Sequence, residues 1–268
     1  MAIDSSVFAA DIPAGTYAAG DIVPLVNIDG PANVRSGRGA AILKNIFVGS
    51  VGTTAPIWKI HVKNSDWVDD VQSVAAHVVQ TTAFDQEAGC SQGGHDATLT
   101  ENSGWQVYAE CIAGATSTVG NSIFALIDVD YPQVSSITDP RKVKGLPASI
   151  QYNVTGATVT ANGAMVGSTW QVASVDYFKA GNEYALDAVE TYTSVANLFG
   201  FIAFSNAAGM GGLQRIIPIN SLIQGIRYPV EYASKLVKGP MDIKLKFFGT
   251  AGTTNVFMMH DYVKRVKA

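Results

Sequence analysis

The sequence predicts an all-β chain of two tandem β-sandwich modules, jelly-roll-like, with a few short helices. Three observations support this class. Short runs rich in Val, Ile, Thr, Tyr and Phe alternate with Gly, Asn, Asp and Pro. Gly- and Thr-rich joints separate several of these runs, and the sign of the net charge changes once, at a Pro-rich stretch near the middle of the 268 residues. This length is enough for two modules of about 130 residues, each with its own core.

The predicted strands have the usual strand length and occur in both halves. The first half contains Ile42–Val48, Ile57–Val62, Gln106–Ile112 and Ser122–Asp130, and the second contains Ile150–Val154, Thr169–Val175, Ile243–Phe248 and Asn255–Tyr262. Joints at 49–54, 114–120 and 249–254 are rich in glycine, which adopts the positive φ angles that hairpin turns require.

Helix is expected only in short pieces. The best candidate is Trp67–Gln80, in which several apolar residues share one side of a helix. These residues are Val68, Val71, Val74, Ala75 and Val78. Two further candidates are Pro218–Gly225 and Val230–Val237.

Charge divides the chain into two predicted domains. Residues 1–138 hold 14 Asp and Glu against 5 Lys and Arg, a net charge of −9, whereas residues 139–268 hold 8 against 13, a net charge of +5. A boundary between domains is expected in a Pro-rich stretch. We therefore predict an acidic module at 1–134, a linker at 135–148 and a basic module at 149–268.

Two echoes in the sequence suggest that the second module duplicates the first. A Gly/Thr-rich turn followed by an apolar strand that closes in Asp-Tyr occurs around Phe124 and again around Phe257, 133 positions later. A second echo, Tyr17–Asp21 against Phe178–Asn182, has an offset of 161. The offsets disagree, so unequal insertions or chance similarity remain the two explanations.

Composition indicates a surface that packs against partners. Apolar residues make up 47% of the chain and charged residues only 15%, whereas about 25% is average. No apolar run approaches the roughly 20 residues of a membrane helix. The start Met1–Ser6 has no basic region or apolar core of a secretory signal, so we expect synthesis in the host cytoplasm.

No catalytic residue, cofactor site or metal site is predicted. The four histidines, His61, His77, His95 and His260, have no metal-ligand spacing. Cys90 and Cys111 form no CxxC pair, and the Gly-rich stretches lack phosphate-binding patterns. Asp66, Asp69 and Asp70, or Asp128 with Asp130, could bind calcium, but acids in the first turn of a helix explain the first cluster better.

Nucleic-acid and carbohydrate binding find little support. The basic residues of the second half are spread out, and Lys244 and Lys246 alternate with apolar residues as on a strand with a solvated face. There is no basic N-terminal arm, so direct nucleic-acid contact is not expected. Trp58 and Trp170 lie within strand patterns and are expected in the core instead of on a sugar-binding platform.

The segments Gly15–Val23 and Asn33–Ile46 resemble bacteriophage virion structural proteins. These are β-sandwich capsid or head-decoration subunits that often begin with a Tyr-x-x-Gly-Asp strand, here Tyr17 to Asp21. The resemblance covers about the first fifty residues. Two modules in one chain also resemble the double jelly-roll capsid subunits of other viruses, in which trimers form a pseudo-hexagonal tile.

The resemblance implies a structural component of a bacteriophage particle, a capsid subunit or a decoration protein, that acts by self-assembly. Its partners would be copies of itself, in trimers or higher oligomers, and other virion proteins. Acidic residues on one subunit would contact basic residues on its neighbour. The predicted contact residues are Asp66, Asp69, Asp70, Asp85, Glu87, Arg141, Lys142, Lys144, Lys235 and Lys238. The alternative is a host-receptor or carbohydrate-binding module of a phage tail or fibre.

Overall fold

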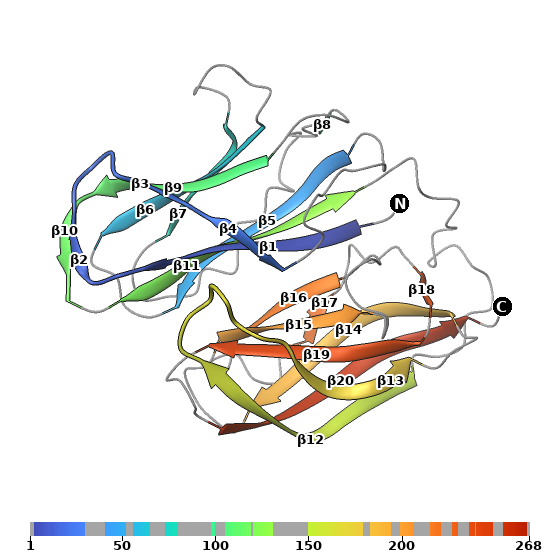
Figure 1. The fold of residues 1–268 in the computed structure, drawn as a ribbon. Coiled ribbons are helices and arrows are strands. Elements are labelled where there is room, and N and C mark those ends of the chain that lie inside the picture. The colour runs from blue at the N-terminus through green and yellow to red at the C-terminus, as the bar shows by residue number, and fades with distance from the viewer. Residues whose placement is uncertain are drawn as a thin grey trace. The chain divides into compact units, whose positions relative to one another are not determined.

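The computed structural model describes most of the predicted strands. The described residues are 3–29, 41–51, 56–64, 73–79, 98–99, 105–118, 120–130, 150–178, 183–193, 199–205, 215–220, 227–229, 236–238, 240–248 and 254–266. Within these ranges the only regular elements are β-strands (Figure 1). The all-β prediction is therefore confirmed.

The strands of the first half are β1 to β11. They are β1 (Ile3–Ile12), β2 (Gly15–Tyr17), β3 (Ile22–Pro24), β4 (Val26–Asp29), β5 (Ala41–Val51), β6 (Ile57–Asn64), β7 (Ser73–Val79), β8 (Thr98–Leu99), β9 (Trp105–Ala113), β10 (Ala115–Ser117) and β11 (Asn121–Asp130).

The strands of the second half are β12 to β20. They are β12 (Ile150–Asn162), β13 (Gln171–Phe178), β14 (Glu183–Thr193), β15 (Phe199–Ser205), β16 (Arg215–Asn220), β17 (Arg227–Pro229), β18 (Leu236–Lys238), β19 (Met241–Phe248) and β20 (Thr254–Val266). All eight predicted strands overlap strands of the structure.

The contacts divide the chain into two compact units. The N-terminal unit comprises Ser5–Gln133 with the short segment Ala164–Ser168, and the C-terminal unit comprises Met1–Asp4, Val134–Gly163 and Thr169–Ala268. The predicted linker, 135–148, lies outside the described residues, so the predicted domain bounds remain a prediction.

In the N-terminal unit the strands pair in a nested order. One sheet has the order β4-β1-β11-β5-β8, and a second has the order β3-β9-β6-β7. The strands β2 and β10 pair in a separate sheet of two strands. The pairs β1–β11, β2–β10, β3–β9, β5–β8 and β6–β7 thus enclose one another along the chain (Figure 1). This is the pattern of one long ribbon rolled into two sheets, as in jelly rolls.

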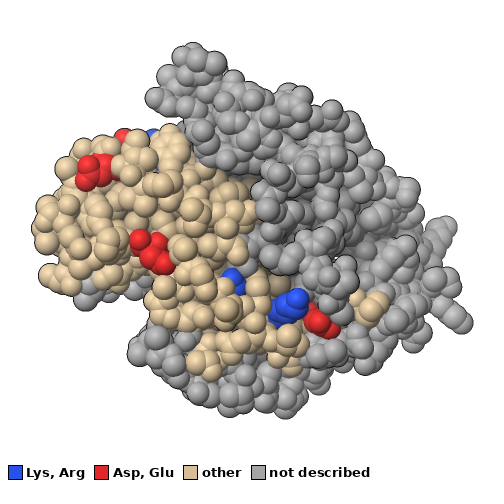
Figure 2. All heavy atoms as spheres, viewed as in Figure 1, with Lys and Arg blue, Asp and Glu red and all other residues tan. Residues whose placement is uncertain are grey.

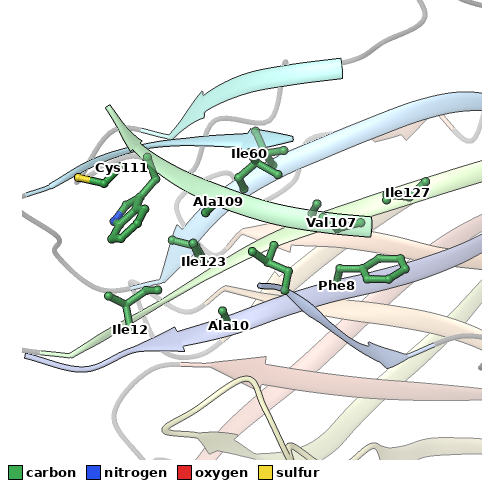
Figure 3. Close-up of a cluster of buried hydrophobic side chains, with 13 residues drawn as sticks. Phe8, Ala10, Ile12, Ile60, Val107, Ala109, Cys111, Ile123 and Ile127 are labelled. Carbon is green, nitrogen blue, oxygen red and sulfur yellow. The ribbon is translucent and has the colours of Figure 1, made fainter. Parts of the chain in front are cut away.

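The core of the N-terminal unit lies between these two sheets. One sheet contributes Phe8, Ala10 and Ile12 of β1 with Val48 and alternate residues of β11, and the other contributes Trp58 and Ile60 of β6 with Val107, Ala109 and Cys111 of β9. Figure 3 shows these side chains pointing toward one another from the two layers. Period-two alternation directs each set inward, so the unit is a β-sandwich.

The C-terminal unit repeats the same nested order. Here β12-β20-β14-β17 are neighbours, β13 pairs with β19, and β19 continues to β15 and β16. The two groups join where the end of β12 runs parallel to β19, with Ala161 opposite Phe247 and Asn162 opposite Phe248. Chain order therefore makes β12, β13, β19 and β20 the equivalents of β1, β3, β9 and β11.

One of the two sequence echoes joins equivalent strands, and the other does not. Phe124 lies in β11 and Phe257 in β20, which are equivalent strands. The second echo sets the turn before β3 against Phe178, the last residue of β13. Those places are not equivalent, so only the first echo agrees with the strand order.

The predicted helix Trp67–Gln80 is wrong over Ser73–Val79, which is β7. Apolar residues at 74, 75 and 78 fit both a helical face and a short strand, and pairing with β6 decides the outcome because valine favours strands. Parts of the other two helix candidates are also strands, namely Pro218–Asn220 in β16 and Leu236–Val237 in β18. The rest of each candidate lies outside the described residues.

All three predicted joints also contain strand residues, and in the joint 249–254 the described one is Thr254, the first residue of β20. Gly49–Val51 continues β5 along β11, and Ala115–Ser117 forms β10. A glycine in these joints is required by space at one position: a Cβ atom on Gly114 would lie 2.5 Å from the carbonyl oxygen of Tyr17.

Candidate functional site

Among the described surfaces, the outer face of the β3–β9–β6 sheet is the best candidate for binding a partner. Alternate residues of β9 and β6 point into the core, so the residues between them form the opposite face. We call this the outer face; it comprises Ile22 and Pro24 of β3, Tyr108, Glu110 and Ile112 of β9, and Lys59 and His61 of β6.

Two isoleucines stand out on the outer face. The exposed fraction is 63% for Ile22 and 42% for Ile112. Ile22 lies opposite Glu110, two residues before Ile112, so the isoleucines are diagonal neighbours on the same side of the sheet. A pair of exposed isoleucines at the end of a sheet is an apolar patch available to another protein surface.

His61 organises the polar part of the outer face. Its Nε2 atom lies 2.9 Å from Oε2 of Glu110, and its ring stacks on that of Tyr108 with centroids 4.8 Å apart. The side chain is almost fully buried, and Nδ1 has no hydrogen-bond partner among the described residues. Burial lowers the pKa of His61 below the ordinary 6.5, Lys59 lowers it further, and the hydrogen bond to Glu110 opposes the shift. The ring is therefore neutral near pH 7.

The edge of this sheet is blocked against strand addition. The backbone N–H of Leu25 donates to the carbonyl oxygen of Val107, and the backbone N–H of Cys111 donates to the carbonyl oxygen of Asp21. Because the backbone groups of successive strand residues point to opposite sides, those of residues 22 and 24 point away from β9. Pro24 has no N–H to offer a further strand. Prolines also stand in β16 (Pro218) and β17 (Pro229), each at the end of its sheet order. At these three edges, proline opposes the addition of a further strand.

Charge is sparse on the described surface. In the described part of the face that Figure 2 shows, charged side chains are few and are surrounded mostly by uncharged residues. Every large hydrophobic side chain that is exposed in the described part is aliphatic: Ile22, Val26, Ile112, Val166 and Val172. Trp58, expected in the core, is fully buried and makes an edge-on contact with Tyr17, whereas Trp170 precedes β13 and is half-buried.

The charged residues predicted to make subunit contacts remain a prediction. Nine of the ten lie outside the described residues: Asp66, Asp69, Asp70, Asp85, Glu87, Arg141, Lys142, Lys144 and Lys235. Lys238 is in β18, in register with Glu183 of β14. The structure thus adds two isoleucines that the sequence analysis did not select. The signal for Ile112 was present, because alternation in its predicted strand places it with Tyr108 and Glu110.

The described residues present little that could perform chemistry. Cys111 is fully buried, and burial raises the pKa of its thiol, so the thiolate is disfavoured. Within the described ranges no three His, Cys, Asp or Glu side chains come close enough to hold a metal ion. In the same ranges no helix is long and apolar enough to cross a membrane.

The prediction of a solvated face for Lys244 and Lys246 is wrong for Lys246. Its side chain is only 1% exposed, and its ammonium group lies 4.9 Å from the ring centre of Trp170. Lys244 is half-buried. The long aliphatic stem and a cation–π contact allow the lysine to be covered, and alternation along the strand does not reveal this.

No protein-family model matches the sequence, and no curated protein matches it. Solved structures similar to the chain include one from the cryo-EM structure of Broad Bean Stain Virus, with 9% identity, a TM-score of 0.25, and coverage of 98% of this chain and 90% of that chain. Another is the VP2 subviral particle of infectious bursal disease virus, with 10% identity, a TM-score of 0.26, and coverage of 99% and 71%. TM-scores this low do not establish a shared fold, and nothing about function follows from them.

Proposed function

We propose that this chain is a structural subunit of a virus particle, a bacteriophage capsid protein that works by self-assembly. The observation that supports it most is the strand order: the two units share the same nested pairing, which is the pairing expected of a double jelly roll. Jelly rolls build viral capsids but also lectins and cupins. Because fold alone does not assign function, the surface must decide among these.

The described surface favours contact with protein over contact with sugar. Sugar-binding sandwiches need exposed aromatic rings, and the exposed large hydrophobic residues of the described part are all aliphatic. The outer face combines Ile22 and Ile112 with Lys59 and Glu110, a mixture of apolar and charged groups that suits the contact between two subunits. This surface is the second support for a shell subunit.

Opposite charges are the other part of the proposal. The acidic group Asp66, Asp69, Asp70, Asp85 and Glu87 would face the basic group Arg141, Lys142, Lys144, Lys235 and Lys238 of a neighbour. Contacts of this kind weaken as salt screens them, whereas apolar contacts persist. A shell subunit is favoured over a decoration protein, because two sandwiches in one chain provide two contact-making modules.

The test substitutes the two isoleucines of the outer face. Ile22→Asp combined with Ile112→Asp should shift the sedimentation coefficient of the full chain from an oligomer to the monomer, because a buried unpaired charge opposes association. Val172→Asp is the matched control: Val172 is 55% exposed in β13, a strand that contributes no residue to the outer face. An oligomer unchanged by the double substitution would contradict a role for the outer face. A wild-type chain that is monomeric at every concentration would contradict self-assembly itself.

The alternative is a host-receptor or carbohydrate-binding module of a tail or fibre. Its support is Trp170, which is half-buried and therefore retains an accessible part. Binding of the full chain to a panel of glycans, lost in Trp170→Ala, would favour this alternative. The shell proposal predicts no glycan binding.

A further inference from the structure

The carboxylate of Asp11 in β1 binds a turn from the second half of the sequence. The amide of Met165 donates to Oδ1 at 2.9 Å, and the amide of Val166 donates to Oδ2 at 3.0 Å. The hydroxyl of Ser122 in β11 also donates to Oδ1. Both carboxylate oxygens thus have partners, two of them more than 150 positions away in the sequence.

The bound turn has a defined geometry. The amide of Ser168 donates to the carbonyl oxygen of Met165 at 3.2 Å, and Gly167 has a φ of 75°. A positive φ at the third position, with this hydrogen bond, is typical of a type II turn. Glycine is required there by backbone conformation, since a Cβ atom on Gly167 would meet nothing within 4 Å.

This turn is more than a connection between two strands. Its base is held within the C-terminal unit, where the side-chain amide of Gln171 makes two hydrogen bonds to the backbone of Thr160, 2.8 and 2.6 Å long. Its tip, Ala164–Ser168, instead belongs to the N-terminal unit by its contacts, and Met165 is fully buried. A loop that only joined β12 to β13 would need neither a buried methionine nor a distant carboxylate.

We propose that Asp11, Ser122 and the turn Ala164–Ser168 form a latch that completes the N-terminal unit. When the latch is closed, it holds the tip of the β12–β13 connection on the N-terminal unit. When it is open, that tip is free and the Met165 side chain loses its burial. The latch is an opening and closing device of the single chain, and it does not depend on the proposed function.

A carboxylate is chemically suited to this position. It offers an acceptor on each oxygen and no donor, and hydrogen bonds to a charged acceptor are about twice as strong as neutral ones. An asparagine has one oxygen, so its NH₂ group would face one of the two amides. Asp11→Asn therefore keeps the shape of the side chain, removes its charge and leaves one of the two amides facing a donor, which weakens the latch at both amides.

Hydrogen exchange of the full chain tests the latch at the two amides. Asp11→Asn should speed exchange at Met165 and Val166 by about tenfold or more, since a hydrogen bond to a charged group holds each amide. Asp21→Asn is the matched control, because Asp21 accepts from the amide of Ala18 at 2.8 Å, three residues away. In that variant the exchange rates of Met165 and Val166 should equal those of the wild type.

Gly167→Ala is a second way to open the latch, because it strains the turn and leaves Asp11 itself unchanged. It should speed exchange at the same two amides, and it replaces Asp11→Asn as the deciding variant if that chain does not fold. Rates at Met165 and Val166 that stay at the wild-type value in a folded Asp11→Asn or Gly167→Ala chain would overturn the latch.

Discussion

Two equivalent sheets of the molecule share a strand order and differ in their outer surfaces. In the β3–β9–β6 sheet of the N-terminal unit, Ile112 is exposed and Glu110 half-buried on the face opposite the core. In the β13–β19–β15 sheet of the C-terminal unit, β19 is covered on both faces from Leu245 to Phe248, where all four side chains are buried. Exposure on this sheet is found instead at Val172 of β13, opposite Lys244. Nested pairing thus fixes the fold, while the choice of residues decides which face remains available to a partner.

The cores also differ in what fills them. Among the described residues of the N-terminal unit, Trp58 is the largest buried side chain, and its ring packs edge-on against Tyr17. The C-terminal unit buries Phe201 and Phe248, whose rings meet edge-on at 5.8 Å, and places the ring of Phe247 against Gly200. Because both cores support the same pairing, the duplicated fold does not require duplicated packing.

Removing Trp58 should have the largest effect on stability. Trp58→Ala leaves a cavity between the two sheets of the N-terminal unit and should lower the free energy of unfolding by about 3–5 kcal/mol. Urea denaturation followed by far-UV circular dichroism measures this loss. Trp58→Phe keeps most of the volume and should cost less; equal losses would mean that the cavity is not the cause.

Gly200 tests the packing of the C-terminal unit. A Cβ atom there would lie 2.3 Å from the carbonyl oxygen of Lys246 and 2.7 Å from Cδ1 of Phe247. Gly200→Ala should therefore destabilise the chain by about 1–3 kcal/mol, the usual range for overpacking. Gly15→Ala is the control in the same denaturation assay, since its Cβ atom would find ordinary contacts at 3.8 Å. A Gly200→Ala chain as stable as the control would show that the backbones of β15 and β19 move apart at this position without a loss of stability.

The two lysines of β19 should differ although they lie on the same face. Lys246→Ala removes a buried stem and the contact with Trp170 and should cost about 2 kcal/mol. Lys244→Ala should cost less, because Lys244 is half-buried. The comparison uses the same urea denaturation. Equal losses in the free energy of unfolding would contradict a stabilising role for the buried side chain of Lys246.

The smallest predicted effect is the pH dependence due to His61. Because burial lowers the pKa of His61 in the folded state, the unfolded chain binds more protons as the pH falls below about 6.5. The stability contribution of the neutral ring is therefore complete above this pH and is lost on acidification until the folded pKa is passed. Unfolding free energies of wild type and His61→Gln between neutral and mildly acidic pH should show a shallower slope in the variant. Parallel slopes would contradict the assignment.

The sequence predicts the strands well where alternation is clear, as in Gln106–Ile112 and Ser122–Asp130. It fails at Ser73–Val79, because apolar spacing there fits two kinds of structure and only pairing with β6 decides. Exposure at Ile22 and burial at Lys246 depend on which side of a sheet is covered, a tertiary property that residue type does not encode. Pairings between distant residues, such as Asp11 with Met165, leave no local signal at all.

Self-assembly of this chain is the central claim, and the mass of the full chain in solution tests it most directly. Light scattering over a range of protein concentrations, at low salt and at about 1 M salt, would be combined with negative-stain imaging of each species. We predict trimers, larger oligomers or shell fragments that loosen, without fully dissociating, in high salt. A compact monomer under all of these conditions would contradict the claim.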